Sequence, residues 1–174
     1  MGETECIVRP LAFQVVDPRV TEHSTALRFA VATFDTWDGV RGTLQNLGAD
    51  GLGSETVSLL GLNHVLGESA REANLPAAVY RELPFPGNRS LIWCTAGLLA
   101  ERLAGRLLAG APTLKAALGQ WLIPRHAAEI ADGVEDGRIV LWVQLFDSEG
   151  EHRAYRSLLA GSSHSVGVHD LVAD

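Results

Sequence analysis

The chain has 174 residues, of which 47% are hydrophobic, so it is long enough to bury the core of one compact domain. Its formal net charge of −7 and its scattered arginines argue against a nucleic-acid binder held by phosphate contacts. Cys6 and Cys94 form no metal-binding motif and are interpreted as free thiols of a reducing compartment, with a disulfide between them left open.

The N-terminal segment, residues 1–25, is predicted to be an arm on a single domain that spans residues 1–174. Pro10 and Pro18 leave room there for no more than an edge strand, since proline lacks the N–H group that a central strand needs. The first ten residues, MGETECIVRP, carry early acids and do not form a secretory signal. We therefore expect a cytoplasmic protein.

The first half of the predicted fold, residues 26–61, follows the order strand, helix, strand. ALRFAVATF (26–34) places its large apolar side chains on one face and smaller ones on the other, which is typical of a strand. Asp35 or Thr36 then caps a helix whose apolar residues recur at helical spacing. ETVSLLG (55–61) is the second strand.

Residues 62–122 are predicted to be an insertion between the two halves of the fold. Several prolines in its first part mark turns and extended chain, with a short helix near 68–74 and a strand near 89–94. The pattern from 97 to 121 becomes helical and is interrupted by GAP at 110–112, which indicates a helix pair.

The apolar part of this insertion does not predict a membrane span. Over residues 93–112, Glu101, Arg102 and Arg106 would each cost roughly 2.5–3.5 kcal/mol at the bilayer centre, against about 0.3–0.6 kcal/mol gained from each leucine. Peripheral contact of the helix at 97–110 with anionic lipid is a third hypothesis, which the acidic remainder of the chain opposes. We expect no membrane contact.

The second half, residues 123–174, begins with a helix that Pro124 opens. Four residues at i, i+3, i+4 and i+7 form its apolar stripe: Ala127, Ile130, Ala131 and Val134. After the EDG turn, RIVLWVQLF (138–146) is apolar on both faces, which predicts a strand covered on both sides.

The last helix and strand complete this half. Ser148 and Glu151 fit an S-x-x-E capping box. The helix that follows is expected to turn four residues inward: Ala154, Tyr155, Leu158 and Leu159. HSVGVHDL (164–171) is the final strand.

The two halves resemble each other, because RFAVATFDT and VLWVQLFDS both run from an apolar strand through Phe-Asp into a helix. Two such strand–helix–strand units predict an α+β, ferredoxin-like sandwich with a helical insertion and an N-terminal arm. Aligning Phe34 with Phe146 places both on one sheet face with Trp142 and Gln144. This apolar face requires a cover, either the central helices or a second copy of the chain.

Two segments carry a family pattern, ATFDTWDGVRGTLQNLGADGLGSETVSLLG (32–61) and LKAALGQWLIPRHAAEIADGVEDGRIVLWVQLFDSEGEHRAYRSLLAGSSHSVGVHDL (114–171). They resemble bacterial general-stress (heat-induced stress) proteins and related small domains of unknown function. The resemblance implies a stress-associated or housekeeping bacterial domain without assigned chemistry, so it brings no catalytic residues. Relatives often have an almost uncharged middle, whereas this chain carries Glu101, Arg102, Arg106 and Lys115 there.

Few residues are candidates for chemistry. His126 and Glu129 are three apart on a helix but point away from its apolar stripe, so a solvated helix face with Arg125 beside Glu129 is the preferred interpretation. Asp35 and Asp147 are interpreted as helix caps. His164 and His169 are expected on opposite faces of a strand, and GSSHS is expected to be a loop.

No catalytic residue, metal site or cofactor is predicted, and the sequence leaves open whether the protein is an enzyme. The leading hypothesis is a non-enzymatic protein that acts by self-association, as a homodimer, or by binding a protein partner, with a role in stress. The alternative is a small-ligand-binding or enzymatic sandwich. Its pocket would lie on the sheet face of Trp142, Gln144, Phe34 and Phe146, which the leading hypothesis makes an oligomer face.

Overall fold

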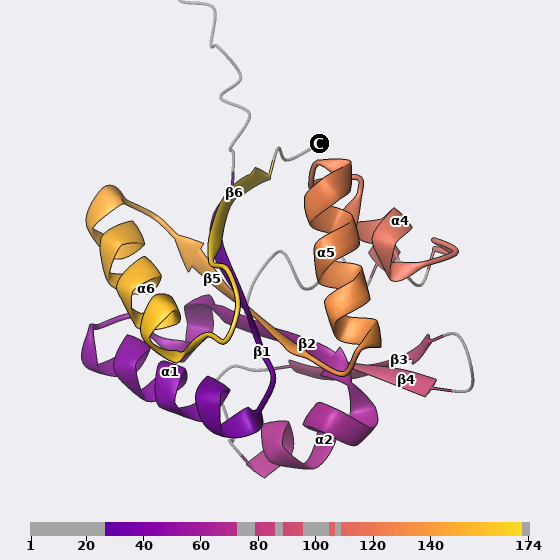
Figure 1. The fold of residues 1–174 in the computed structure, drawn as a ribbon, viewed down its shortest axis with the longest axis horizontal. Helices are drawn as coiled ribbons and strands as arrows, with labels where there is room; N and C mark the ends of the chain where they lie inside the picture. The colour runs from indigo at the N-terminus through magenta and orange to yellow at the C-terminus, as the bar shows by residue number, and fades with distance from the viewer. Residues whose placement is uncertain (1–26, 73–78, 86–88, 96–104, 107–108, 172–174) are drawn as a thin grey trace, which may run out of the picture.

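A computed structural model describes residues 27–72, 79–85, 89–95, 105–106 and 109–171, which form an antiparallel sheet with helices on both faces (Figure 1). The class is α+β, as predicted. The strands are β1 (Leu27–Phe34), β2 (Val57–Leu62), β3 (Val79–Phe85), β4 (Arg89–Thr95), β5 (Ile139–Leu145) and β6 (Gly167–Leu171). The helices are α1 (Trp37–Ala49), α2 (Asn63–Glu72), α4 (Leu114–Leu118), α5 (Pro124–Glu135) and α6 (Ser148–Gly161), with a short 3-10 turn at Ser54–Thr56.

The six strands lie in the order β3-β4-β2-β5-β1-β6, and every neighbouring pair is antiparallel. β5 therefore lies between β1 and β2, although β2 ends at Leu62 and β5 begins only at Ile139. The hairpin of β3 and β4 extends the sheet beyond β2, so the complete order differs from that of a four-stranded ferredoxin-like sandwich.

Most of the elements predicted from apolar spacing are confirmed within one to three residues. The strand near 89–94 is β4, whereas β3 was not predicted because Pro84 indicated extended chain only. β3 is the outermost strand, a position where the missing N–H group of a proline costs little. Of the helix pair, the second member contains α4, and the first lies largely outside the described residues.

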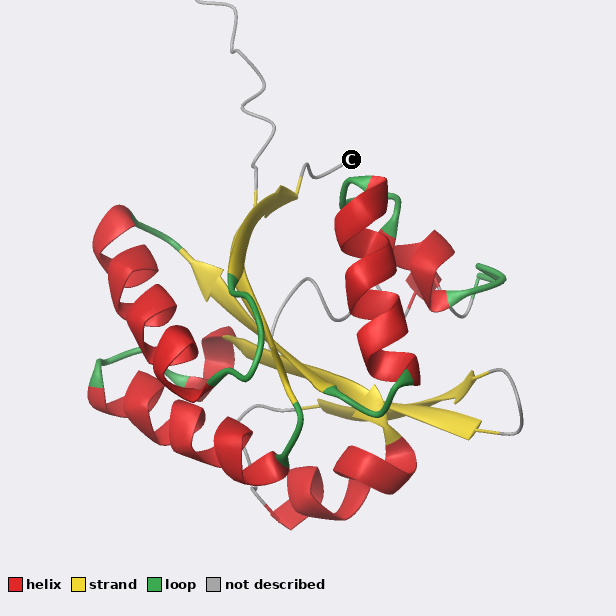
Figure 2. Ribbon diagram, in the orientation of Figure 1, coloured by secondary structure: helices red, strands yellow, loops and turns green. Residues whose placement is uncertain are grey.

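Both faces of the sheet are covered by helices (Figure 2): α1 and α6, together with Leu66 of α2, cover one face, while α4 and α5 cover the other. The side chain of Trp142 is 1% exposed in the core beneath α4 and α5. Of the two covers considered for this face, the internal one is therefore found. Among the described residues, no helix is long and apolar enough to cross a membrane.

Of the four residues predicted to share one face, Trp142 and Gln144 do so, whereas the prediction was wrong for Phe34 and Phe146. Trp142 lies opposite Val31 and Gln144 opposite Phe29, whereas Phe34 pairs with Ile139 on the reverse face. Phe146 follows the last residue of β5 and is 74% exposed. The alignment failed because β1 and β5 are antiparallel neighbours, so a shared Phe-Asp end does not fix which residues share a face.

Helix α6 begins one residue earlier than the predicted capping box requires. Its cap is Asp147, whose Oδ1 accepts a hydrogen bond from the Gly150 N–H at 2.6 Å. Glu151 does not reach back to this end; its carboxylate instead accepts hydrogen bonds from Arg28 of β1.

The inward face of α6 is narrower than predicted. Ala154 and Leu158 are buried, but Tyr155 is 39% exposed and Leu159 is 52% exposed. The apolar stripe of α6 is therefore wider than the sheet can cover, and part of it faces outward.

Candidate functional site

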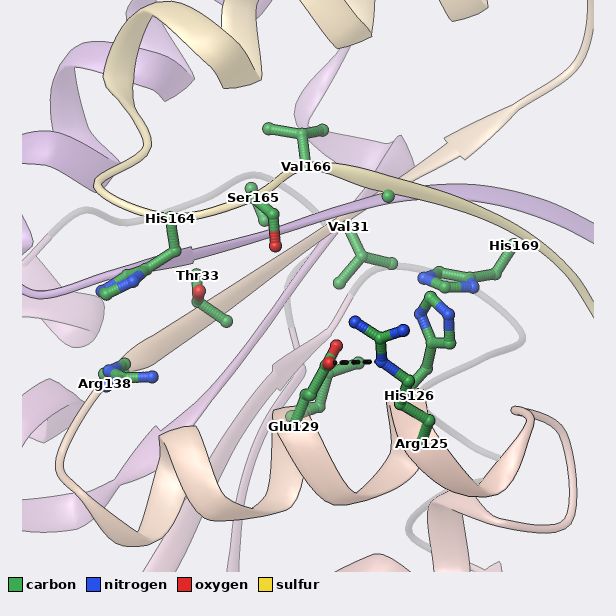
Figure 3. Close-up of a pocket in the computed structure, with 13 residues that line it drawn as sticks. Val31, Thr33, Arg125, His126, Glu129, Arg138, His164, Ser165, Val166 and His169 are labelled. Atoms are coloured by element: carbon green, nitrogen blue, oxygen red, sulfur yellow. Dashed lines mark hydrogen bonds and ion pairs between the residues drawn. The ribbon is translucent and has the colours of Figure 1, made fainter.

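A pocket of about 380 Å³ lies between α5, the edge strand β6 and the loop that precedes β6 (Figure 3). Its volume is in the range that small-molecule sites occupy. Thirteen residues line it: Val31, Ala32, Thr33, Arg125, His126, Glu129, Ile130, Arg138, His164, Ser165, Val166, Gly167 and His169.

Helix α5 contributes Arg125, His126 and Glu129 to one wall. The Arg125 Nε donates to Glu129 Oε1 at 3.0 Å, an i, i+4 pair that confirms the expected neighbourhood of these two residues. Figure 3 shows the Arg125 guanidinium beside the His126 ring, with the Glu129 carboxylate next to it. One turn of α5 therefore supplies a guanidinium, an imidazole and a carboxylate to the pocket.

Strand β6 supplies His169 to the opposite wall. The His126 and His169 rings meet edge to face, with 4.8 Å between their centroids and an angle of 76° between their planes. Burial lowers the pKa of His169 below its ordinary value, and the charge of His126 acts in the same direction. Asp170 and Glu129 oppose this shift.

A second cluster closes the other end of the pocket. His164 Nε2 lies 2.7 Å from Asp35 Oδ1, and Arg138 Nε lies 3.7 Å from the same carboxylate oxygen. The hydrogen bond with His164 holds the pKa of Asp35 below its usual value. Asp35 does not cap α1, because Thr36 accepts the hydrogen bond from the Gly39 N–H.

Two local structures place this cluster. Gly137 has a φ of +87°, a conformation that favours glycine, and it ends α5 so that Arg138 enters β5 at the pocket wall. The loop after α6 is closed by the hydroxyl of Ser162, which donates to the carbonyls of Thr33 and His164 and accepts from the His164 N–H. GSSHS is thus a loop, as predicted, and its serine hydroxyl at 162 has a structural role.

The chemistry of the pocket favours anions. Two guanidiniums and three imidazoles line the pocket with one carboxylate, that of Glu129, in a chain whose formal net charge is −7. A second carboxylate, that of Asp35, pairs with His164 and Arg138 beside the pocket. Guanidiniums and imidazolium groups donate hydrogen bonds that match carboxylate and phosphate oxygens. Within the described residues, no group of three histidine, cysteine or acidic side chains has an arrangement that holds a metal ion.

None of the predicted site residues lines this pocket. Trp142 and Phe34 are buried on opposite sides of the sheet, Gln144 is half-buried, and Phe146 is exposed beyond the end of β5. The cavity lies instead beside Val31, the cross-strand neighbour of Trp142. The predicted face thus borders the pocket but does not form it.

Two predictions about histidines were wrong. His126 was expected to face solvent, yet it is half-buried against His169. His164 and His169 were expected on opposite faces of one strand, but β6 begins at Gly167, so the face rule does not apply to His164. The available signal was the i, i+4 spacing of His126 and the inward-facing Ile130, which places both on one side of α5.

Comparisons of the chain with protein-family models, with curated proteins and with solved structures gave no match. The resemblance to bacterial general-stress proteins therefore stays a prediction from the sequence.

Proposed function

We propose that this protein binds a small organic anion, bearing a carboxylate or phosphate group, in the pocket between α5 and β6. The observation that carries the proposal is the convergence of Arg125, Arg138 and three histidines on one cavity of about 380 Å³. A strongly acidic chain repels anions from most of its surface, so two guanidiniums together with imidazole N–H donors define one place where an anion is attracted.

Arg125 is the principal donor in this proposal. Its side chain is 82% exposed and, within the part of the chain that the structure describes, bonds to Glu129 on its own helix, a surface pair of small net stability. An anionic ligand can replace the Glu129 carboxylate at the guanidinium with little loss of folding stability. His126 and His169 then supply ring N–H donors from the two walls, and Arg138 supplies positive charge at the far end.

The alternative hypothesis of a ligand-binding sandwich thus becomes the leading one, with its pocket moved from the face of Trp142 to the edge of the sheet.

The proposal includes a ferredoxin-like core, and the order of β2, β5, β1 and β6, with α1 and α6 on one face, supports it. These six elements are a ferredoxin-like core, which β3 and β4 extend. A role in bacterial stress stays part of the proposal on the strength of the sequence resemblance alone.

The test is a titration of the full-length protein with inorganic phosphate and with citrate, followed by the NMR signals of the histidine rings and by calorimetry. We expect saturable shifts at His126 and His169. Arg125→Gln is expected to weaken binding at least about tenfold, the effect of losing one charge-assisted hydrogen bond of roughly 1.5–3 kcal/mol. A preference for one of the two probes identifies the anionic group that the site accepts.

Arg41→Gln is the matched control, because Arg41 is also an exposed helical arginine that bonds to an acid one turn away, Asp38, and it does not line the pocket. It should leave the affinity unchanged. Glu129→Gln should strengthen binding, since it removes the competing carboxylate. The proposal fails if millimolar phosphate and citrate leave the histidine signals unmoved, or if Arg41→Gln weakens binding as much as Arg125→Gln.

A further inference from the structure

On the other side of β6 lies an apolar groove that the anion pocket does not use. It has a volume of about 560 Å³ and lies between the outward face of α6 and β6. Six residues line it: Glu151, His152, Tyr155, Arg156, Leu159 and Val168. Tyr155 and Leu159 are half of the large apolar side chains that are exposed among the described residues. Two exposed apolar groups beside one groove indicate a surface that another molecule covers.

The sheet edge beside the groove is open. β6 is the last strand in the sheet order, and within the described residues it pairs with β1 alone. A strand edge offers unpaired N–H and C=O groups in a row, to which a further strand can add. Its sequence, GVHDL, contains neither a proline nor a lysine, and its one charged residue, Asp170, pairs with Arg28 of β1. The groove and the open edge thus form one continuous surface.

Charges of opposite sign lie along this surface. Glu151, near the N-terminus of α6, accepts hydrogen bonds from Arg28 of its own chain. Arg156 lies five residues further along the same helix; it is 71% exposed and its guanidinium lies 3.4 Å from the Asp50 carboxylate. If two copies of α6 cross in opposite directions about a two-fold axis near residues 153–154, Arg156 faces Glu151 of the partner subunit, and the reverse pair forms as well. A two-fold axis is the arrangement in which one surface meets itself.

We infer that the α6–β6 surface is the interface of a homodimer, in which β6 pairs antiparallel with its copy and Tyr155 and Leu159 pack against the partner's α6. This interface is separate from the anion pocket, which lies on the opposite face of β6. It also replaces the dimer face predicted from the sequence, because Trp142 is covered within its own chain.

The test is sedimentation of the full-length protein over a concentration series, with the wild type and two variants. The wild type is expected to be a dimer. Leu159→Asp is expected to raise the dimer dissociation constant at least about tenfold, the size of effect that a charge in an apolar contact produces. Ile123→Asp is the matched control, because Ile123 is also exposed, at 62%, but lies at the start of α5 and does not line the groove. This control should remain dimeric.

Three outcomes would overturn the inference. The first is a wild type that stays monomeric at about 100 μM, well above the micromolar range typical of weak specific association. The second is a dimer that Leu159→Asp does not weaken, which would place the interface elsewhere. The third is a monomer whose β6 amides resist hydrogen exchange on the side away from β1, which would assign the groove to a segment of the same chain. Circular dichroism of each variant establishes that it is folded.

Discussion

The two faces of the sheet are closed by helices in opposite ways. On one face α1 and α6 approach so closely that a Cβ atom on Gly39 would lie 3.3 Å from the carbonyl oxygen of Gly161. On the other face the rings of His126 and His169 stand between α5 and β6, with 4.8 Å between their centroids. The first contact excludes space, and the second borders a pocket of about 380 Å³.

The difference shows how residue size at a helix contact separates stability from binding. Glycines let backbones touch, so the core between α1, α6 and the sheet is continuous. Histidines are larger and carry hydrogen-bonding nitrogens, and where α5 meets β6 their rings border the pocket. We therefore expect substitutions in the two cores and at the glycine contact to change folding, and substitutions at the pocket to change ligand binding.

The largest effect is expected from Trp142→Ala, which removes a buried side chain from the core under α4 and α5. The free energy of unfolding should fall by about 3–5 kcal/mol, since truncating a large core aromatic leaves a cavity. Urea unfolding measures it. Phe146→Ala is the control, because Phe146 is 74% exposed and should change stability by no more than about 0.5 kcal/mol. Equal effects of the two substitutions would contradict the assignment of Trp142 to the core.

A smaller effect is expected where α1 and α6 meet. In Gly161→Ala the new methyl group would overlap the Thr43 hydroxyl and lie 3.3 Å from the Gly39 carbonyl oxygen. Overpacking of this kind costs about 1–3 kcal/mol and should lower the melting temperature. Gly42→Ala is the matched control on α1, because nothing lies within 4 Å of its new methyl group and alanine favours the helix. If both variants melt alike, the contact is looser than described.

The elements on which this comparison rests were largely predictable from the sequence. The spacing of apolar residues in α1, α5 and α6, and the two-sided apolar run in β5, reflect burial directly, so they gave element positions to within a few residues. Pro124 marked the first turn of α5 as expected. Each of these signals lies within one helix or strand. Such a signal is sufficient to place the element where burial of one face determines the spacing of its apolar residues.

The pocket was not predictable in the same way, because its walls come from segments far apart in the chain. His126 and His169 meet only because β6 pairs with β1 at the sheet edge, beside α5. The spacing within α5 shows that His126 flanks the apolar stripe, but it does not show which strand lies opposite. Likewise, Tyr155 and Leu159 fit an inward stripe by spacing, yet the sheet ends before it covers them.

The smallest expected effect is the pH dependence that His169 gives to the sheet edge beside the pocket. Burial, with the charge of His126 added, lowers the pKa of His169 below 6.5 in the folded protein, while Asp170 and Glu129 pull the other way. The unfolded chain therefore binds the proton more readily than the folded one. The stabilising contribution is complete above pH 6.5 and is lost as the pH falls through the lower pKa of the folded state. Urea unfolding at several pH values should show this decline, and His169→Gln should reduce it. His152→Gln is the control, because His152 is exposed on α6 and lies away from His126 and His169, so it should leave the decline unchanged. If His169→Gln also leaves the decline intact, the group that takes up the proton is not His169.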